Sequence, residues 1–121
     1  MDSIKLVLPF PPSSNTAYPS IMRGRKILRV KSKKLKDWIK AAPDLSDYKF
    51  AGGRYTISYL LFFPDDRGRD GQNLMKVPLD YMVSQGVFID DNRKIICGEQ
   101  WFDGGIDREK PRVEITIKEY K

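Results

Sequence analysis

Two short stretches of the sequence hold carboxylates whose types and spacing could do chemistry. Asp70 lies where a charged loop enters an expected helix, and Asp90 and Asp91 follow that helix. Paired carboxylates can hold a divalent cation, which activates water and neutralises charge on a phosphate. Lys76, about one and a half turns into the helix, could offer a fixed positive charge to a pentacoordinate transition state or to a leaving oxygen. We expect the helix to return the chain so that Asp70 and Asp91 converge at one end of a sheet.

The residue types that the sequence lacks narrow this chemistry. The chain of 121 residues has no histidine, which excludes hydrolases with a histidine base, His-ligated zinc and the histidine-dependent nucleases. Its single cysteine, Cys97, can form neither an intrachain disulfide nor a cysteine-based zinc site. Phosphodiester chemistry must therefore use carboxylates and a hard cation, most naturally Mg²⁺, with Mn²⁺ as the alternative. The residue pattern alone leaves a simpler interpretation open, in which Asp70 only caps a helix and Asp90-Asp91 is only a turn.

A strongly basic segment accounts for the formal net charge of +6. Between residues 23 and 40, Asp37 is the only acid among nine cations, which are Arg23, Arg25, Lys26, Arg29, Lys31, Lys33, Lys34, Lys36 and Lys40. Arg67 and Arg69 add two more cations immediately before Asp70. Such clustering is typical of a surface that follows nucleic-acid phosphates. A solvated helix face is the alternative, and an anionic membrane surface is disfavoured because the segment offers few large apolar side chains.

The periodicity of apolar residues indicates the elements that must position these side chains. It predicts strands over 3–9, 54–63, 94–102 and 112–119, with a hairpin over 20–31 that turns at Arg23-Gly24-Arg25. It predicts helices over 32–42, capped by Ser32, and over 72–85, where Pro78 requires a kink or a later start. The proline-rich stretch 9–15 is expected to be extended and not helical.

These elements predict one domain over residues 1–121, of α+β (mixed α/β) class. We expect one mixed β-sheet with two main helices packed on it. Strand 54–63 is apolar on both faces and is therefore expected at the centre of the sheet. Trp38 and Trp101 are expected in the core. No apolar run approaches the roughly 20 residues that span a bilayer, and no signal-peptide pattern opens the sequence, so we expect a soluble cytoplasmic protein.

Three segments, taken together and in order, resemble the RusA family of Holliday-junction resolvases. They read Leu8-Pro9-Phe10-Pro11-Pro12-Ser13-Ser14-Asn15, then Arg69-Asp70-x-x-Asn73-Leu74-x-Lys76-x-x-x-Asp80, then Gly86-x-x-x-Asp90-Asp91. The resemblance runs across nearly the whole chain. It implies a homodimeric endodeoxyribonuclease, often carried by phages or prophages, that binds four-way DNA junctions and makes paired symmetric nicks with Mg²⁺.

The resemblance also assigns roles to individual residues. The family motif after the arginine-rich loop usually reads Asp-x-Asp-Asn, whose first Asp matches Asp70 and whose Asn matches Asn73. The family lysine matches Lys76, and the later carboxylate matches Asp91. Asp70, Lys76 and Asp91 are thus implied as catalytic, and Asp70, Asp91, Gln72 and Asp90 as the candidate metal ligands. Asn73 and Asp80 are expected to support the site, Asp80 either by pairing with Lys76 or by helping catalysis.

Gln72 departs from the family pattern, because it stands where the second Asp of the motif is expected. It could be a neutral metal ligand, or another acid such as Asp66, Asp80 or Asp90 could replace the missing carboxylate. Alternatively, the protein binds junction DNA and cuts it weakly or not at all. A third interpretation is a basic protein associated with RNA or the ribosome, in which the aspartates would be dispensable.

Overall fold

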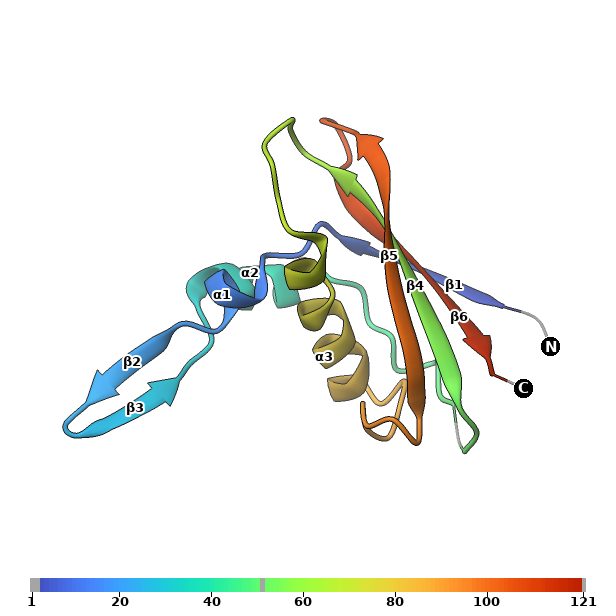
Figure 1. Ribbon diagram of the computed structural model, residues 1–121, viewed down its shortest axis with the longest axis horizontal. Helices are drawn as coiled ribbons and strands as arrows, with labels where there is room; N and C mark the ends of the chain where they lie inside the picture. The colour runs from blue at the N-terminus through green and yellow to red at the C-terminus, as the bar shows by residue number, and fades with distance from the viewer. Residues whose placement is uncertain (1–2, 51, 121) are drawn as a thin grey trace.

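Four strands form the main sheet of the computed structural model, which describes residues 3–50 and 52–120 (Figure 1). β1 (Ile4–Pro9), β6 (Arg112–Glu119), β4 (Tyr55–Phe63) and β5 (Ile96–Ile106) lie in that order across the sheet. β6 pairs antiparallel with β1 and with β4, whereas β4 and β5 run parallel. β4 has a hydrogen-bonded neighbour on each side, so its expected central position is confirmed. The mixed sheet with helices packed on it also confirms the α+β class.

Side chains alternate between the two faces of this sheet, and one face holds the core. Leu8, Tyr59 and Ile115 come from three neighbouring strands and are fully buried on that face. The buried side chains of the helices belong to the same cluster. Figure 1 shows the longer helices on this side of the sheet, with α3 (Lys76–Ser84) lying along β4 and β5. The two main helices that the sequence predicts therefore pack on one face.

α2 (Lys33–Ala41) begins at its predicted cap. The Ser32 hydroxyl accepts a hydrogen bond from the backbone N–H of Leu35 at 3.1 Å. Trp38, on the apolar side of α2, is buried and meets the ring of Tyr81 on α3 edge-on, with ring centroids 5.3 Å apart. This aromatic contact joins the two helices in the core.

Pro78 determines how the second helix starts. Residues Gly71–Leu74 form a separate 3-10 turn, η1, and α3 begins only after it, at Lys76. Pro78 is thus the third residue of α3, within the first turn, where its missing N–H would have had no intrahelical acceptor. The sequence predicted that Pro78 requires either a kink or a later helix start, and the later start is confirmed. The predicted bounds of 72–85 for one continuous helix are wrong.

A short helix in the proline-rich stretch corrects a second prediction. α1 (Ser14–Ala17) forms where we expected only extended chain. The Ser13 hydroxyl accepts a hydrogen bond from the N–H of Thr16 at 3.3 Å and so caps the turn. Because the prolines all precede this cap, they do not prevent a single helical turn from following it.

The predicted hairpin is confirmed as a two-stranded arm, which consists of residues 20–29. β2 (Ser20–Arg23) pairs antiparallel with β3 (Lys26–Arg29), and the turn between them contains two residues. Gly24, the first turn residue, has a φ of 62°, as a type II′ turn requires. Figure 1 shows the arm projecting away from the rest of the molecule.

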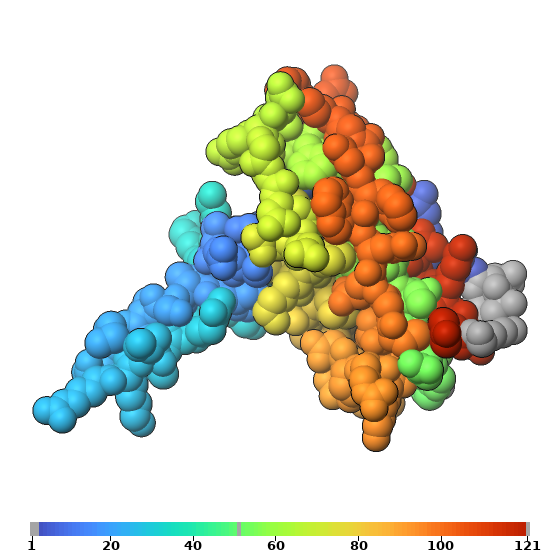
Figure 2. All heavy atoms as spheres, in the orientation of Figure 1, coloured from blue at the N-terminus to red at the C-terminus, as the bar shows by residue number. Residues whose placement is uncertain are grey.

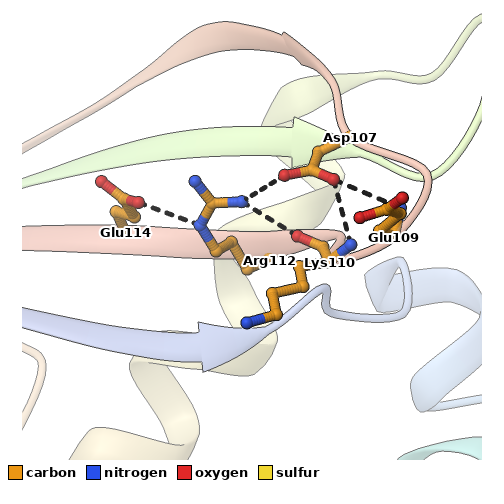
Figure 3. Close-up of polar contacts among 5 residues, drawn as sticks. All are labelled: Asp107, Glu109, Lys110, Arg112 and Glu114. Carbon is orange, nitrogen blue, oxygen red and sulfur yellow. Dashed lines mark hydrogen bonds and ion pairs between the residues drawn. The ribbon is translucent and has the colours of Figure 1, made fainter.

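The last two strands are joined by a polar turn at one end of the sheet (Figure 3). The Arg112 guanidinium donates from Nη1 to Asp107 Oδ2 at 2.8 Å and from Nε to Glu114 Oε2 at 2.9 Å. Asp107 also accepts from the backbone N–H groups of Glu109 and Lys110. These hydrogen bonds to Asp107, together with Arg112, lower the pKa of its carboxyl. The turn is thereby held in place at the end of the sheet.

β5 is longer than the predicted strand over 94–102 and starts two residues later. Its end, Ile106, still pairs with Phe63 of β4, beyond the glycines at 104 and 105. Glycines disfavour strands in a sequence pattern, but the register shift near this end accommodates them. Within residues 3–50 and 52–120, the structure contains no helix that is long and apolar enough to cross a membrane.

Candidate active site

Asp70 lies at the edge of a surface cavity next to the carboxyl end of β4. It caps η1, because its Oδ1 accepts a hydrogen bond from the backbone N–H of Gln72 at 3.0 Å, and its side chain remains exposed. The cap function that the sequence left open is therefore real, but it leaves the second carboxylate oxygen free for a ligand. The cavity is lined by Phe10, Pro11, Pro12, Ser13, Thr16, Lys34, Asp37, Trp38, Arg67, Arg69, Asp70, Asn73 and Leu74.

The proline-rich segment forms one wall of this cavity, although it is about sixty residues from Asp70 in the sequence. The Trp38 indole N–H donates to the carbonyl oxygen of Pro9 at 3.0 Å and so ties the segment to α2. Phe10 packs against Phe63 at the end of β4, with ring centroids 5.4 Å apart. The structure therefore places this proline-rich segment at the cavity.

Arg69 is the most firmly held cation in the cavity. Its Nη1 donates to Asp65 Oδ1, 2.6 Å away, and its Nη2 donates to Asp65 Oδ2 at 3.1 Å. Its guanidinium also lies 5.5 Å from the ring centroid of Phe10. The hydrogen bond from Arg69, together with one from the Arg67 N–H, lowers the pKa of Asp65 to about 2. A guanidinium positioned in this way before a ligand arrives can bind an anion with little loss of side-chain entropy.

Gly71 and Trp101 position Asp70, and sequence reasoning assigned a functional role to neither. The indole of Trp101, on β5, lies directly against the buried Cα of Gly71, so that a methyl group at Gly71 would overlap with the ring. The chain just after Asp70 can approach β5 only because Gly71 has no side chain. The glycine beside a candidate catalytic residue was the one signal in the sequence that could have indicated this contact.

Lys76 is engaged with Asp80 and Tyr18. Its Nζ lies 3.3 Å from Asp80 Oδ2 and 5.6 Å from the ring centroid of Tyr18. The Tyr18 hydroxyl donates to the same Asp80 oxygen at 2.8 Å. Burial of Tyr18, followed by this hydrogen bond, raises the pKa of its hydroxyl. The pairing of Asp80 with Lys76 is therefore confirmed, while a role of Asp80 in catalysis stays a prediction.

Asp90 and Asp91 lie between the end of α3 and the amino end of β5. The Asp90 carboxylate accepts from the side-chain amide of Asn92 at 2.9 Å and from the backbone N–H of Asp91 at 2.7 Å, and both bonds lower its pKa. Both aspartates are exposed. They precede the amino end of β5, whereas Asp70 follows the carboxyl end of β4.

The expected convergence of Asp70 and Asp91 is therefore wrong within one chain. β4 and β5 are neighbouring parallel strands, so α3 must carry the chain back along the sheet before β5 can begin (Figure 1). A residue before such a crossover helix follows the carboxyl end of the first strand, and a residue after it precedes the amino end of the second strand. The two residues are therefore separated along the length of the helix. Among residues 3–50 and 52–120, no three Asp, Glu or Cys side chains are grouped closely enough to hold a metal ion.

Comparison with models of known protein families assigns the chain to a family. The family model described as Endodeoxyribonuclease RusA matches residues 9–118, which is nearly the whole chain. The chain belongs to the RusA family. No protein of curated function matches it closely enough to be counted as a relative. The cavity at Asp70 therefore belongs to a protein of an endodeoxyribonuclease family. This match agrees with the resemblance of the three segments.

The cations expected to bind DNA in this RusA-family chain lie on the arm and the residues that follow it, on α2, and in the loop before Asp70. Arg23, Arg25, Lys26 and Arg29 are exposed on the arm, Lys31 follows it, and Lys33, Lys34 and Lys36 are exposed on α2. Lys33 is paired with Asp37 at 2.8 Å, and this hydrogen bond lowers the pKa of the Asp37 carboxyl. Lys34 reaches the cavity wall, where Arg67 and Arg69 are also found. Exposed cations are thus found on the arm, on α2 and at the cavity beside Asp70.

Proposed function

We propose that this protein is a metal-dependent endodeoxyribonuclease that resolves four-way DNA junctions by paired symmetric nicks. The observation that carries the proposal is the cavity in which an exposed carboxylate, Asp70, lies beside Lys34, Arg67 and Arg69. Phosphodiester cleavage needs cations to hold the phosphate and a carboxylate to hold the ion that activates water. Such an enzyme would act in the cytoplasm, where chromosomal or phage DNA is found.

Arg69 and Asp70 have different roles at the scissile phosphate. Arg69, fixed by Asp65, is positioned to bind a non-bridging phosphate oxygen through its guanidinium. Asp70 offers a carboxylate oxygen, and the amide of Asn73 is the neighbouring oxygen donor. Mg²⁺ or Mn²⁺, when bound, would supply a Lewis acid and a water of lowered pKa. The donors are all oxygen atoms, which suits these hard cations, but one chain supplies too few carboxylates for a tight site.

A homodimer would overcome this shortage. Because Asp70 and Asp91 lie on the two sides of α3, before and after the crossover, both can serve one ion only if they come from two copies of the chain. In a two-fold dimer, the cavity at Asp70 of one copy would face Asp90 and Asp91 of the other, and the same contact would occur twice. Two equivalent sites would then meet the two equivalent strands of a junction. We therefore propose that the metal site is completed across the dimer.

The test is cleavage of a synthetic four-way junction by single and mixed variants, with linear duplex as the control substrate. Asp70→Asn and Asp91→Asn should each abolish nicking in Mg²⁺ or Mn²⁺. When the two inactive variants are unfolded and refolded together, about half of the dimers should be mixed, and each mixed dimer has one intact composite site. Nicking should therefore return to about a quarter of the wild-type level.

The outcomes of this mixing experiment separate the alternatives. Sites built within one chain would leave the mixture inactive, because every chain then carries one inactivating change. Nicking by both single variants at the wild-type level would overturn the assignment of Asp70 and Asp91 to the site, and a wild type that nicks no junction would overturn the nuclease proposal itself. Lys76→Met should lower nicking and leave junction affinity nearly unchanged, if its ammonium assists the leaving oxygen.

A junction-binding protein that cuts weakly is the second candidate, and Gln72 is the observation that favours it. Its side chain is exposed next to Asp70, where it offers a neutral amide oxygen in place of the carboxylate of the family motif. A neutral ligand should raise the Mg²⁺ concentration needed for half-maximal nicking. Gln72→Asp should lower that concentration if position 72 contacts the ion. Tight junction binding without nicks at any metal concentration, in wild type and in Gln72→Asp, would establish the binding protein.

A further inference from the structure

The arm, residues 20–29, has an apolar pair near its tip that the fold does not cover. Met22 and Ile27 are direct cross-strand partners, so their side chains lie on the same face of the ribbon. Their side chains are 67% and 70% exposed, which is far from the burial that such residues normally reach. The arm stands clear of the body of the molecule (Figure 2). Within the described chain, each strand of the arm is hydrogen-bonded only to the other.

Positive charge surrounds this apolar pair. Arg23 and Lys26, the next cross-strand pair, close the hairpin, and Arg25 lies in the turn between them. Arg29 pairs with Ser20 at the base of the arm, and residues 20–29 contain no acid. Packing two such arms against each other would bring together eight cations, four from each copy, so the charge argues against a second copy as the partner of the apolar pair. A polyanion with apolar surface is the ligand that this composition fits.

The base of the arm is fixed to the body, so its direction is defined. Backbone hydrogen bonds from Val30 N to Pro19 O, 3.1 Å, and from Ser32 N to Ala17 O, 2.9 Å, join the two ends of the arm to α1 and α2. Four residues per strand give a reach of about 13 Å at about 3.3 Å per residue. A two-stranded ribbon of this size fits a DNA groove about 12 Å wide. Lys34 of α2, which follows the arm in the sequence, lies at the wall of the cavity at Asp70.

We propose that the arm is a wedge that enters the branch point of junction DNA, where Met22 and Ile27 pack against bases and unstack them. Methionine and isoleucine are among the side chains that unstack base steps in this way, and flanking cations hold the phosphates while they do so. A branch point already interrupts the stacking of base pairs, so the wedge has less stacking to overcome there than in linear duplex. The inference rests on the proposed function and adds to it the part of the chain that recognises and opens the branch.

The experiment uses a four-way junction with 2-aminopurine at the branch point, whose fluorescence rises when the base unstacks. All proteins carry Asp70→Asn so that the strands stay intact, and junction affinity is measured in parallel by fluorescence anisotropy. Binding of the Asp70→Asn protein should raise the fluorescence about threefold. Adding Met22→Ala and Ile27→Ala should keep the affinity within about threefold, because the cations remain, but should remove the rise.

Two further variants serve as controls. Val7→Ala removes a comparably exposed apolar side chain from β1, outside the arm, and should leave both the affinity and the fluorescence rise unchanged. Arg23→Gln with Lys26→Gln should instead weaken junction binding and reduce the slope of log affinity against log salt by about two. Circular dichroism of each variant verifies that the exposed substitutions leave the fold intact.

A full fluorescence rise in the Met22→Ala, Ile27→Ala protein would overturn the wedge. Light scattering without DNA that shows this variant as a monomer and its parent as a dimer would overturn it too, because the apolar pair would then pack on a second copy. If wild type nicks junctions but the bound parent gives no fluorescence rise, the wedge fails and the proposed nuclease stands. If wild type neither binds nor nicks junctions, both are wrong.

Discussion

Gly71→Ala tests most directly whether the contact between η1 and β5 sets the position of Asp70. The added methyl group would overlap with the Trp101 indole, so the ring or the η1 backbone must move until the atoms are about 3.5–4 Å apart. Trp101 is itself partly buried in a paired strand, which limits how far the ring can retreat. We therefore expect η1, and Asp70 with it, to shift by about 1 Å.

Two magnitudes follow from this shift. Overpacking of this kind lowers the free energy of unfolding by about 1–3 kcal/mol. A displacement of about 1 Å at a catalytic group lowers the rate of the chemical step by about 100-fold. Junction affinity should change little, because the cations on the arm and α2 lie outside the affected turn. The assays are urea unfolding and single-turnover junction nicking with enzyme in excess.

Gly68→Ala is the matched control for this prediction. Gly68 lies in the same loop, has an ordinary backbone φ, and a methyl group there would meet no atom within 4 Å. We expect it to change the unfolding free energy by less than about 0.5 kcal/mol and to leave nicking unchanged. Trp101→Ala should restore nicking in the Gly71→Ala background if the overlap is the cause. A Gly71→Ala protein as stable and as active as Gly68→Ala would refute the reasoning.

Three other predictions concern stability. Ser32→Ala removes the cap of α2 and should lower the free energy of unfolding by about 1 kcal/mol, seen as a lower urea midpoint with an unchanged slope. Tyr18→Phe removes the hydroxyl that donates to Asp80 and should cost about 0.5–1.5 kcal/mol, whereas an unchanged thermal midpoint would mean that the bond contributes nothing. The pKa of Asp65 falls from 3.8 to about 2 on folding, so the carboxylate stabilises the fold above pH 3.8, and this stabilisation is lost as the pH falls through 2. Arg69→Gln should reduce this acid-dependent loss of stability. Identical profiles of unfolding free energy against pH for the variant and the wild type would contradict the prediction.

Local features of the sequence determined most of the secondary structure. Ser32 marks the start of α2, and Gly24 marks the turn of the arm, because caps and tight turns depend on the chemistry of one or two residues. The regular alternation over residues 112–119 predicts β6 with its bounds correct. The two errors in the helices, at Ser13 and Pro78, concern where a helix begins around prolines. Both follow from whether the missing N–H falls inside or outside the first helical turn.

The sequence also determined the chemistry that the protein can do. The absence of histidine and the clustering of cations restrict it to carboxylates and polyanions, because these properties depend on composition and not on the path of the chain. Three ordered segments were enough to indicate the RusA family, which the family match confirms.

Only the tertiary structure decided which of these groups meet. The proline-rich segment lies beside Asp70 because β1 and β4 both end at that edge of the structure, which no local pattern indicates. Asp70 and Asp91 lie apart because β4 pairs in parallel with β5, and strand direction is set by long-range hydrogen bonding between segments some forty residues apart. A strand pattern has the same periodicity in either direction. Whether a helix between two strands brings its flanking residues together or separates them therefore depends on the sheet, and not on the sequence between them.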